Sequence, residues 1–335
     1  MREPLRLHWR PFSFPLPAAL HTAAGSLHER RGWLLRLETS PGACGWGEAA
    51  PLGVGAAAEA ALQACASAIA QLGPHPSRDA VERLLPALPP PLAFALGAAL
   101  AEADGWVGPA AGGWRQAPPS AWLLPAGEGA LAAAQATLEA WPSPVPPQAS
   151  PPPFKWKVGV HPAPLEQAWY GELAALLPAG VRLRLDANGG WDRPTAWSWA
   201  ERLAGDWRVE WLEQPLDPAD QEGLEALARR VPVALDESLL RQPGLRQRWQ
   251  GWQVRRPSQE GDPRPLLREL QRGHPRWMVS TSFETGIGQR WLAHLAALQA
   301  EGPTPTAPGL APGWQAPGDL GALAPETVWG ACGGA

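Results

Sequence analysis

Residues 209–236 read VEWLEQPLDPADQEGLEALARRVPVALD, and they contain two short apolar segments that each end on an acidic residue. The first segment, VEWLE (209–213), ends at Glu213, and the second, VALD (233–236), ends at Asp236. Short apolar runs of this kind are consistent with buried β-strands. We therefore interpret the stretch as two strands of one sheet, joined by a connection long enough to hold a helix.

The same arrangement repeats between residues 120 and 310. Further strand candidates are AWLLP (121–125), FKWKV (154–158), RLRLD (182–186), WQVRR (252–256) and WMVST (277–281), with an eighth placed near Thr304–Leu310. Helical patterns fill most of the intervals, as at Glu166–Leu177, Pro194–Leu203 and Gly286–Gln299. Strands that alternate with helices indicate a parallel sheet. Seven or eight such units in about 200 residues predict an α/β fold, a (β/α)₈-type barrel.

The first hundred residues have a different order, with strands before helices. We expect strands at LRLHWRPF (5–12) and GWLLRLET (Gly32–Thr39), with a turn near Arg30-Arg31-Gly32. Helical patterns follow at Ala56–Leu72, Arg78–Leu85 and Leu92–Asp104. This order predicts a small α+β domain.

We expect three parts along the chain. An α+β domain covers residues 1–115, a catalytic barrel covers residues 116–312, and a C-terminal tail, residues 313–335, contributes to the first domain. The proline-rich stretch Pro142–Pro153 is expected to form a surface loop before the second barrel strand.

Composition and charge exclude several classes of function. The formal net charge is −4 without long runs of one sign, so we expect no nucleic-acid or membrane partner. Cys44, Cys65 and Cys332 are scattered, which fits neither a disulfide framework nor a metal knuckle and indicates a reduced, cytoplasmic compartment. MREPLRLHWRPF lacks the apolar core of a secretory signal, and Leu92–Ala103 is too short to cross a bilayer. We expect a small-molecule substrate and leave the oligomeric state open.

The chain uses arginine for almost all of its positive charge. Only Lys155 and Lys157 are lysines among 28 lysine and arginine residues, and Asn188 is the sole asparagine. A G/C-rich genome produces such a bias, so the exceptions are the residues that chemistry is expected to retain. Lysine can lose its proton near neutral pH when burial and nearby cations lower its pKa, whereas arginine cannot. We therefore predict that Lys157 is a general base and that Lys155 lowers its pKa and attracts a negatively charged substrate.

Four strand candidates end on or near an ionisable residue, in the order Lys157, Asp186, Glu213 and Asp236. In a parallel barrel the carboxyl ends of all strands meet at one mouth, where such enzymes build their active sites. Three carboxylates that converge there repel one another unless a cation joins them. An all-oxygen ligand set suits a hard divalent ion, and we expect Mg²⁺. For any single one of these acids, a helix cap or a charged loop residue is the alternative interpretation. For the lysine pair alone, the alternative is an edge strand with solvent-exposed, solubilising charges.

These residues lie in motifs that resemble the enolase superfamily, and within it the o-succinylbenzoate synthase family. The barrel motifs are KWKVG (155–159), LRLDANGGW (Leu183–Trp191), WLEQP (Trp211–Pro215), ALDESL (Ala234–Leu239) and VSTSFETGIG (Val279–Gly288). In the first domain, GWGEAAPL (Gly45–Leu52) and LHTAAGSLHERRG (Leu20–Gly32) resemble the loops that cover the substrate in that family. The resemblance implies an enolase-like barrel with an N-terminal α+β capping domain.

The resemblance also implies an activity and residue roles. The family removes water from 2-succinyl-6-hydroxy-2,4-cyclohexadiene-1-carboxylate to give 2-succinylbenzoate in menaquinone and phylloquinone biosynthesis, so the chain would be a Mg²⁺-dependent lyase. Lys157 would be the base, with Lys155 as its neighbour. The implied Mg²⁺ ligands, for which Mn²⁺ can substitute, are Asp186, Glu213 and Asp236. The implied substrate-binding residues are Asn188, Ser280 and Ser282.

One position departs from the family pattern. The family has lysine before the proline of the sixth strand, whereas this chain has Arg256 in VRRPS. Arginine remains a cation, so a charge-stabilising role can persist there. An N-acylamino acid racemase or dipeptide epimerase is the alternative activity, but it needs a second base, which arginine cannot supply. A catalytically impaired, metal-binding homologue is the other alternative, and it leaves the retained lysines unexplained.

Overall fold

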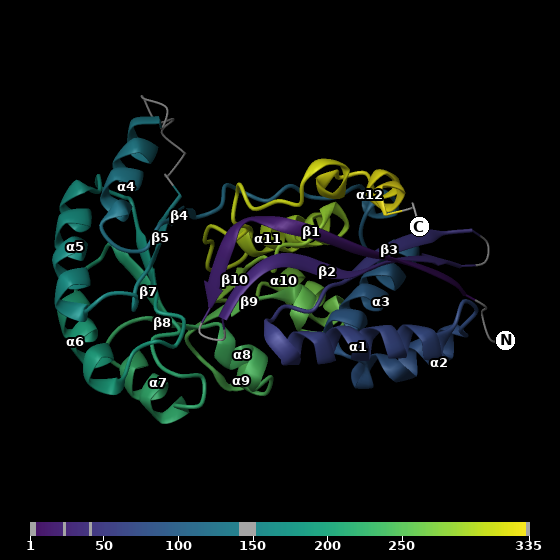
Figure 1. Cartoon of the computed structure of the whole chain (residues 1–335), viewed down its shortest axis with the longest axis horizontal. Coiled ribbons are helices and arrows are strands. Elements are labelled where there is room, and N and C mark those ends of the chain that lie inside the picture. The colour runs from purple at the N-terminus through teal and green to yellow at the C-terminus, as the bar shows by residue number, and fades with distance from the viewer. Residues whose placement is uncertain (1–4, 23–24, 40–41, 141–151, 333–335) are drawn as a thin grey trace. The chain divides into compact units, whose positions relative to one another are not determined.

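The structure is a computed structural model that describes residues 5–22, 25–39, 42–140 and 152–332 (Figure 1). The chain forms two compact units. The first unit comprises Met1–Pro118, Arg255–Pro275 and Val279–Ala335, and the second comprises Pro119–Val254 and Arg276–Met278. The three-part division expected from the sequence stays a prediction. Most of the proline-rich stretch Pro142–Pro153 lies outside the described residues.

A parallel sheet organises the second unit. Its strand order is β10-β9-β8-β7-β6-β5-β4, and each strand found corresponds to one predicted from the sequence. The strands are β4 (Trp122–Leu124), β5 (Phe154–Lys157), β6 (Leu183–Asp186), β7 (Val209–Glu213), β8 (Val233–Leu235), β9 (Trp252–Arg255) and β10 (Trp277–Val279). The predicted α/β, barrel-type fold is thereby confirmed. Near the expected eighth strand, the described residues contain only an isolated parallel bridge between Ser280 and Gly309.

Helices follow most strands of the second unit. They are α4 (Gly129–Ala140), α5 (Ala163–Leu176), α6 (Arg193–Leu203), α7 (Gln221–Ala228), α8 (Glu237–Arg241) and α9 (Leu245–Arg248). Figure 1 shows α4 to α7 along one face of strands β4 to β8. Buried aromatic side chains fill the layer between helices and sheet, with Trp156 from β5, Tyr170 from α5 and Trp199 from α6 in one apolar cluster. Such large side chains supply much of the apolar area that stabilises the layer.

The register of the sheet brings the ends of its strands into line. Lys157 pairs with Asp186 between β5 and β6, and Asp186 pairs with Glu213 between β6 and β7. Glu213 pairs in turn with Ala234 of β8, two residues before Asp236. Successive side chains of a strand point to opposite faces, so Lys155 and Lys157 share the face that Trp156 does not use. The sheet therefore places the ionisable residues side by side at its carboxyl edge.

The first unit contains an antiparallel sheet of order β1-β2-β3 and the remaining helices. The strands are β1 (Arg6–Thr22), β2 (Gly25–Glu38) and β3 (Cys44–Ala49). The helices are α1 (Gly55–Leu72), α2 (Arg78–Leu84), α3 (Pro90–Ala103), α10 (Pro263–Gln271), α11 (Gly286–Ala300) and α12 (Pro325–Ala331). Short 3₁₀ turns are found at Leu85–Ala87, Pro109–Ala111, Pro257–Gln259 and Gly318–Gly321. No helix in the described ranges is long and apolar enough to cross a membrane.

The turn predicted near Arg30-Arg31-Gly32 is wrong, because β2 continues through these residues and Gly32 pairs with Phe12. The strand β3 was not predicted as a strand. Its glycines allow it to pack directly on α3: a Cβ atom at Gly45 or Gly47 would lie 1.8 Å or 2.0 Å from the backbone oxygen of Ala99 or Ala95. The alanine-rich helix and the GWG segment thus fit each other through their small residues.

Candidate active site

Five ionisable side chains gather at the carboxyl edge of the second unit's sheet. Lys155 and Lys157 come from β5, Asp186 ends β6, Glu213 ends β7, and Asp236 follows β8 directly. All three carboxylates are buried. Burying charges is costly unless each finds a partner, so the contacts within this group decide what it can do.

Lys155 is the cation that joins two of the carboxylates. Its Nζ lies 2.7 Å from Asp186 Oδ2 and 2.6 Å from Glu213 Oε1. Burial alone would lower the pKa of Lys155, but the charges of Asp186, Glu213 and Asp236 outweigh burial and raise this pKa above its ordinary value. Lys155 is therefore a fixed positive charge and not a proton acceptor.

The pKa of Lys157 is shifted in the opposite direction to that of Lys155. Burial lowers the pKa of Lys157, and the neighbouring charge of Lys155 lowers it further, against the opposing effect of Asp186 and Glu237. A lysine with a lowered pKa has a larger neutral fraction near neutral pH, and only the neutral amine accepts a proton. Of the two lysines, Lys157 is therefore the better candidate for the base, and this role stays a prediction.

Glu213 combines complete burial with neighbouring charges of both signs. Burial raises the pKa of its carboxyl group, Lys155 opposes this rise, and the charges of Asp186 and Asp236 add to it. The indole Nε1 of Trp211 donates a hydrogen bond to Glu213 Oε2 at 3.3 Å. A further cation near these oxygens would relieve the repulsion among the three carboxylates.

The chemistry of this donor set fits a hard divalent ion, because its ligands are all carboxylate oxygens. In the described part of the chain, no group of three His, Cys, Asp or Glu side chains is placed closely enough to hold a metal as it stands. The Lys155 ammonium lies between two of the predicted ligands. The assignment of Asp186, Glu213 and Asp236 as metal ligands stays a prediction.

Asn188 holds the turn that follows Asp186. Its backbone has a φ of 46°, in the left-handed region that asparagine tolerates better than most residues. Its backbone N–H donates to Asp186 Oδ1 at 2.9 Å, and its Nδ2 donates to Glu237 Oε1 at 3.2 Å. The side-chain amide of the chain's sole asparagine thus contacts an acidic residue of α8. Its predicted role toward substrate is untested.

Glu237 is a residue that the sequence did not reveal as part of this site. It begins α8 directly after Asp236, accepts the hydrogen bond from Asn188, and its charge acts on Lys157. Its position inside the ALDESL motif was the available signal. We interpret Glu237 as a partner that orients the turn after β6.

The remaining predicted residues belong to the first unit. Arg256 directly follows β9, and its Nη1 donates a hydrogen bond to the Thr281 carbonyl oxygen. Ser280 Oγ donates to the Gly309 carbonyl oxygen at 3.2 Å. Ser282 Oγ is buried and has no hydrogen-bond partner in the described ranges. Within this unit, Arg256 therefore contacts the backbone of Thr281, the residue between the two serines.

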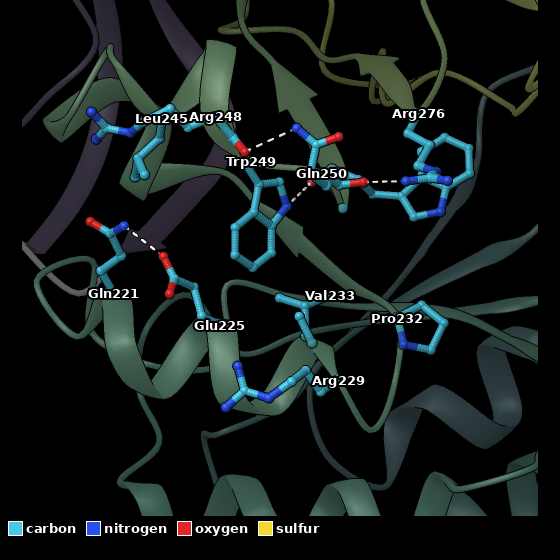
Figure 2. Close-up of a pocket in the computed structure, with 13 residues that line it drawn as sticks. Gln221, Glu225, Arg229, Pro232, Val233, Leu245, Arg248, Trp249, Gln250 and Arg276 are labelled. Atoms are coloured by element: carbon cyan, nitrogen blue, oxygen red, sulfur yellow. Dashed lines mark hydrogen bonds between the residues drawn. The ribbon is translucent and has the colours of Figure 1, made fainter.

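The second unit also has a pocket of about 610 Å³, which is not lined by the ionisable residues at the strand ends (Figure 2). It is lined by Val233 and Trp252, which begin β8 and β9, and by Arg276, which precedes β10. Figure 2 shows the indole of Trp249 in this pocket, and its Nε1 donates to the Trp252 carbonyl oxygen at 3.1 Å. These are the starts of the parallel strands, whereas the ionisable residues stand at their ends. The pocket is therefore separate from the candidate active site.

Comparison with known proteins identifies relatives of this chain. The family model described as "Enolase C-terminal domain-like" matches residues 152–250. The o-succinylbenzoate synthase of Thermosynechococcus vestitus is 36% identical over 302 residues, which cover 87% of this chain and 88% of that protein. The chain belongs to the o-succinylbenzoate synthase family. The o-succinylbenzoate synthase of Edwardsiella ictaluri is 29% identical over 89% of this chain and 87% of its own.

Members of the o-succinylbenzoate synthase family are lyases of the enolase superfamily, and membership confirms the resemblance inferred from the motifs. The solved structure of the Thermosynechococcus elongatus enzyme, complexed with Mg in its active site, has a TM-score of 0.78 and 33% identity. The match covers 97% of this chain and 99% of that chain. It confirms the enolase-like fold predicted from the strand–helix repeat.

Proposed function

We propose that this chain catalyses the Mg²⁺-dependent dehydration of 2-succinyl-6-hydroxy-2,4-cyclohexadiene-1-carboxylate to 2-succinylbenzoate, a step of menaquinone and phylloquinone biosynthesis that takes place in the cytoplasm. The observation that carries the proposal is the pairing of unlike lysines on one strand. Lys155 is held as a cation by buried carboxylates, while the pKa of Lys157 is lowered. The family relationship supports the same activity.

In this proposal Lys157, as the neutral amine, removes the proton α to the substrate carboxylate. The electron pair of that C–H bond becomes part of the new aromatic ring, and the C–O bond at the neighbouring carbon breaks with departure of hydroxide. The proton taken by Lys157 and the departing hydroxide account for the water that is lost. Lys155 contributes a fixed positive charge beside the substrate carboxylate.

Asp186, Glu213 and Asp236 would hold Mg²⁺, with Mn²⁺ as a substitute. When bound, the ion supplies positive charge to the substrate carboxylate as negative charge develops there. Asn188, Ser280 and Ser282 are proposed to contact the substrate, and Arg256 to stabilise its negative charge, on the strength of the family resemblance.

Racemisation of an N-acylamino acid is the second candidate. It requires a base on each face of the substrate. Arg256 stands at the position of the second base, and its guanidinium stays protonated at physiological pH. The hydrogen bond from Arg256 to the Thr281 carbonyl oxygen uses the group as a donor, which agrees with a fixed cation. Dehydration is therefore the better-supported function.

The test is the steady-state conversion of the cyclohexadiene substrate to 2-succinylbenzoate by the purified chain. We expect turnover that EDTA abolishes and that added Mg²⁺ or Mn²⁺ restores. In parallel, solvent-deuterium exchange into an N-acylamino acid is followed by NMR and should be absent. Exchange without dehydration would favour the racemase, and metal binding without either activity would indicate an impaired homologue.

A further inference from the structure

Gln214 is a buried, neutral residue that the sequence analysis did not single out. It directly follows Glu213 and is fully buried. Its φ is 36°, in the left-handed region that residues with a side chain rarely adopt. Such a conformation persists where surrounding contacts hold it, and it often marks a functional site. The contacts of Gln214 show what holds it there.

The side-chain amide of Gln214 clamps the turn that carries Asp236. Its Oε1 accepts hydrogen bonds from the backbone N–H groups of Asp236, at 3.1 Å, and Ser238, at 3.0 Å. Its Nε2 donates to Ser238 Oγ at 2.7 Å and to the Leu216 carbonyl oxygen at 3.0 Å. Both lone pairs and both protons of the amide are therefore used. A fully satisfied buried amide fixes its neighbours strongly, because any displacement leaves a polar group without a partner.

The backbone of Gln214 holds the two neighbouring strand ends. Its N–H donates to the Ala234 carbonyl oxygen of β8 at 2.8 Å. Its carbonyl oxygen accepts from Gly189 N–H at 2.7 Å, in the turn that follows Asp186 and Asn188. Gln214 directly follows β7 and thus contacts both the turn after β6 and the turn after β8. Each of these three strands has one of the carboxylates at its end or directly after it.

We propose that Gln214 is a positioning residue that fixes the spacing of Asp186, Glu213 and Asp236, and thereby sets the affinity of this group for a divalent cation. The inference rests on the proposed function. Three buried carboxylates repel one another, so their turns need a restraint that adds no further charge. A glutamine provides this restraint because its amide is neutral and has both donors and acceptors.

The first test variant is Gln214→Met, which keeps the side-chain length and removes every polar atom of the amide. The second is Gln214→Asn, which keeps the amide and tolerates a positive φ but is one methylene too short to hold the same partners. We expect both to weaken Mn²⁺ binding, measured by EPR titration, by about 10- to 100-fold, the range found when groups that orient metal ligands are removed. At saturating Mg²⁺, kcat should recover to within a few-fold of the parent.

Gln253 provides a matched control. It is also a buried glutamine of the second unit, and its Nε2 donates to the Arg246 and Trp249 carbonyl oxygens near the start of β9. Gln253→Met should lower thermal stability as Gln214→Met does, while its Mn²⁺ affinity stays within about twofold of the parent. A purely structural role for Gln214 would make the two methionine variants equal in Mn²⁺ affinity.

The outcomes separate this inference from the proposed function. A parent chain that binds no Mn²⁺ and has no turnover would overturn the proposed function and with it the inference. A parent that binds and turns over, with Gln214→Asn or Gln214→Met binding Mn²⁺ as tightly as the parent, would overturn the inference alone. Weakened Mn²⁺ binding in the Gln214 variants, with unchanged binding in Gln253→Met, supports it.

Discussion

The two units each bury a group of carboxylates, and the groups are satisfied in different ways. In the second unit, Asp186 and Glu213 contact the ammonium of Lys155. In the first unit, Glu48 of β3 contacts the start of α11: its Oε2 accepts from Thr285 N–H at 2.9 Å and from Thr285 Oγ1 at 2.6 Å. The first group is held mainly by opposite charge, and the second mainly by hydrogen bonds at a helix N-terminus.

Glu284 completes the first unit's group in the same manner as Glu48. It accepts hydrogen bonds from Ser282 N–H, Ser258 Oγ and Thr281 Oγ1. The nearby guanidinium of Arg30 instead donates to the Pro51 and Ala50 carbonyl oxygens. Backbone amides at the start of a helix have fixed positions and favour a negative group there. We infer that Glu48 and Glu284, the α11 group, are structural. We infer that Asp186, Glu213 and Asp236, the strand-end group, can accept a divalent cation, because two of its members contact a lysine side chain.

The largest effect expected from this comparison is on Lys157, the lysine at the strand ends whose pKa is lowered by burial and by the charge of Lys155. Lys157→Arg keeps the charge and removes the amine that can accept a proton, so the dehydration rate should fall by about 10²- to 10⁴-fold, the usual contribution of a general base. Steady-state rates on the cyclohexadiene substrate measure this. A Lys157→Arg protein with near-parental turnover would refute the assignment of the base.

A smaller effect is expected on stability from the α11 group. Burial and the charge of Glu284 raise the pKa of Glu48 from 4.5 to about 7, against hydrogen bonds from Thr285 and the charge of Arg30. The folded chain therefore holds a proton on Glu48 that the unfolded chain releases, so its contribution makes the free energy of unfolding fall as pH rises from about 4.5 to 7.

Glu48→Gln should remove that part of the pH dependence, because glutamine is neutral at every pH and keeps an acceptor oxygen. From pH 4.5 to 8, stability should shift in favour of the variant by up to about 3 kcal/mol relative to the parent. Urea unfolding across this range measures the shift. Parallel pH profiles for both proteins would contradict the raised pKa.

The smallest effect is expected at Arg256, whose Nη1 donates a hydrogen bond to the Thr281 carbonyl oxygen. Arg256→Lys exchanges one cation for another and restores the family residue, so turnover should stay within a few-fold of the parent or improve. The variant also regains a titratable amine, so trace deuterium exchange into an N-acylamino acid should appear. A complete loss of dehydration in Arg256→Lys would show that the guanidinium shape itself is required.

The residues at the strand ends could be predicted because each of them stands out in the sequence. Glu213 and Asp236 end apolar runs, and the lysines and Asn188 stand out from the composition bias. Gln214 lies within the WLEQP motif but has no signal of its own, since a neutral amide becomes important only through partners that the fold brings to it. Glu237 lies within the ALDESL motif, but its role depends on the hydrogen bond from Asn188, which only the fold brings to it.

The errors in the first unit arose from glycine. Gly32 was interpreted as part of a turn, whereas it lies within β2 under the backbone of β3, where a Cβ atom would come within 2.4 Å of the Ala49 carbonyl oxygen. The glycines of β3 likewise serve close packing on α3. Local pattern does not distinguish a glycine that turns the chain from one that lets another element approach.

The most direct test of the central claim is Mn²⁺ binding to one variant from each carboxylate group. Asp236→Asn and Glu284→Gln each remove one negative charge from a buried carboxylate, and EPR titration measures the affinity of both against the parent, with circular dichroism to verify folding. We predict that the parent binds Mn²⁺, that Asp236→Asn binds at least about tenfold more weakly, and that Glu284→Gln stays within about twofold of the parent. Equal weakening in both variants, or parental affinity in Asp236→Asn, would contradict the claim that only the strand-end group takes a divalent cation.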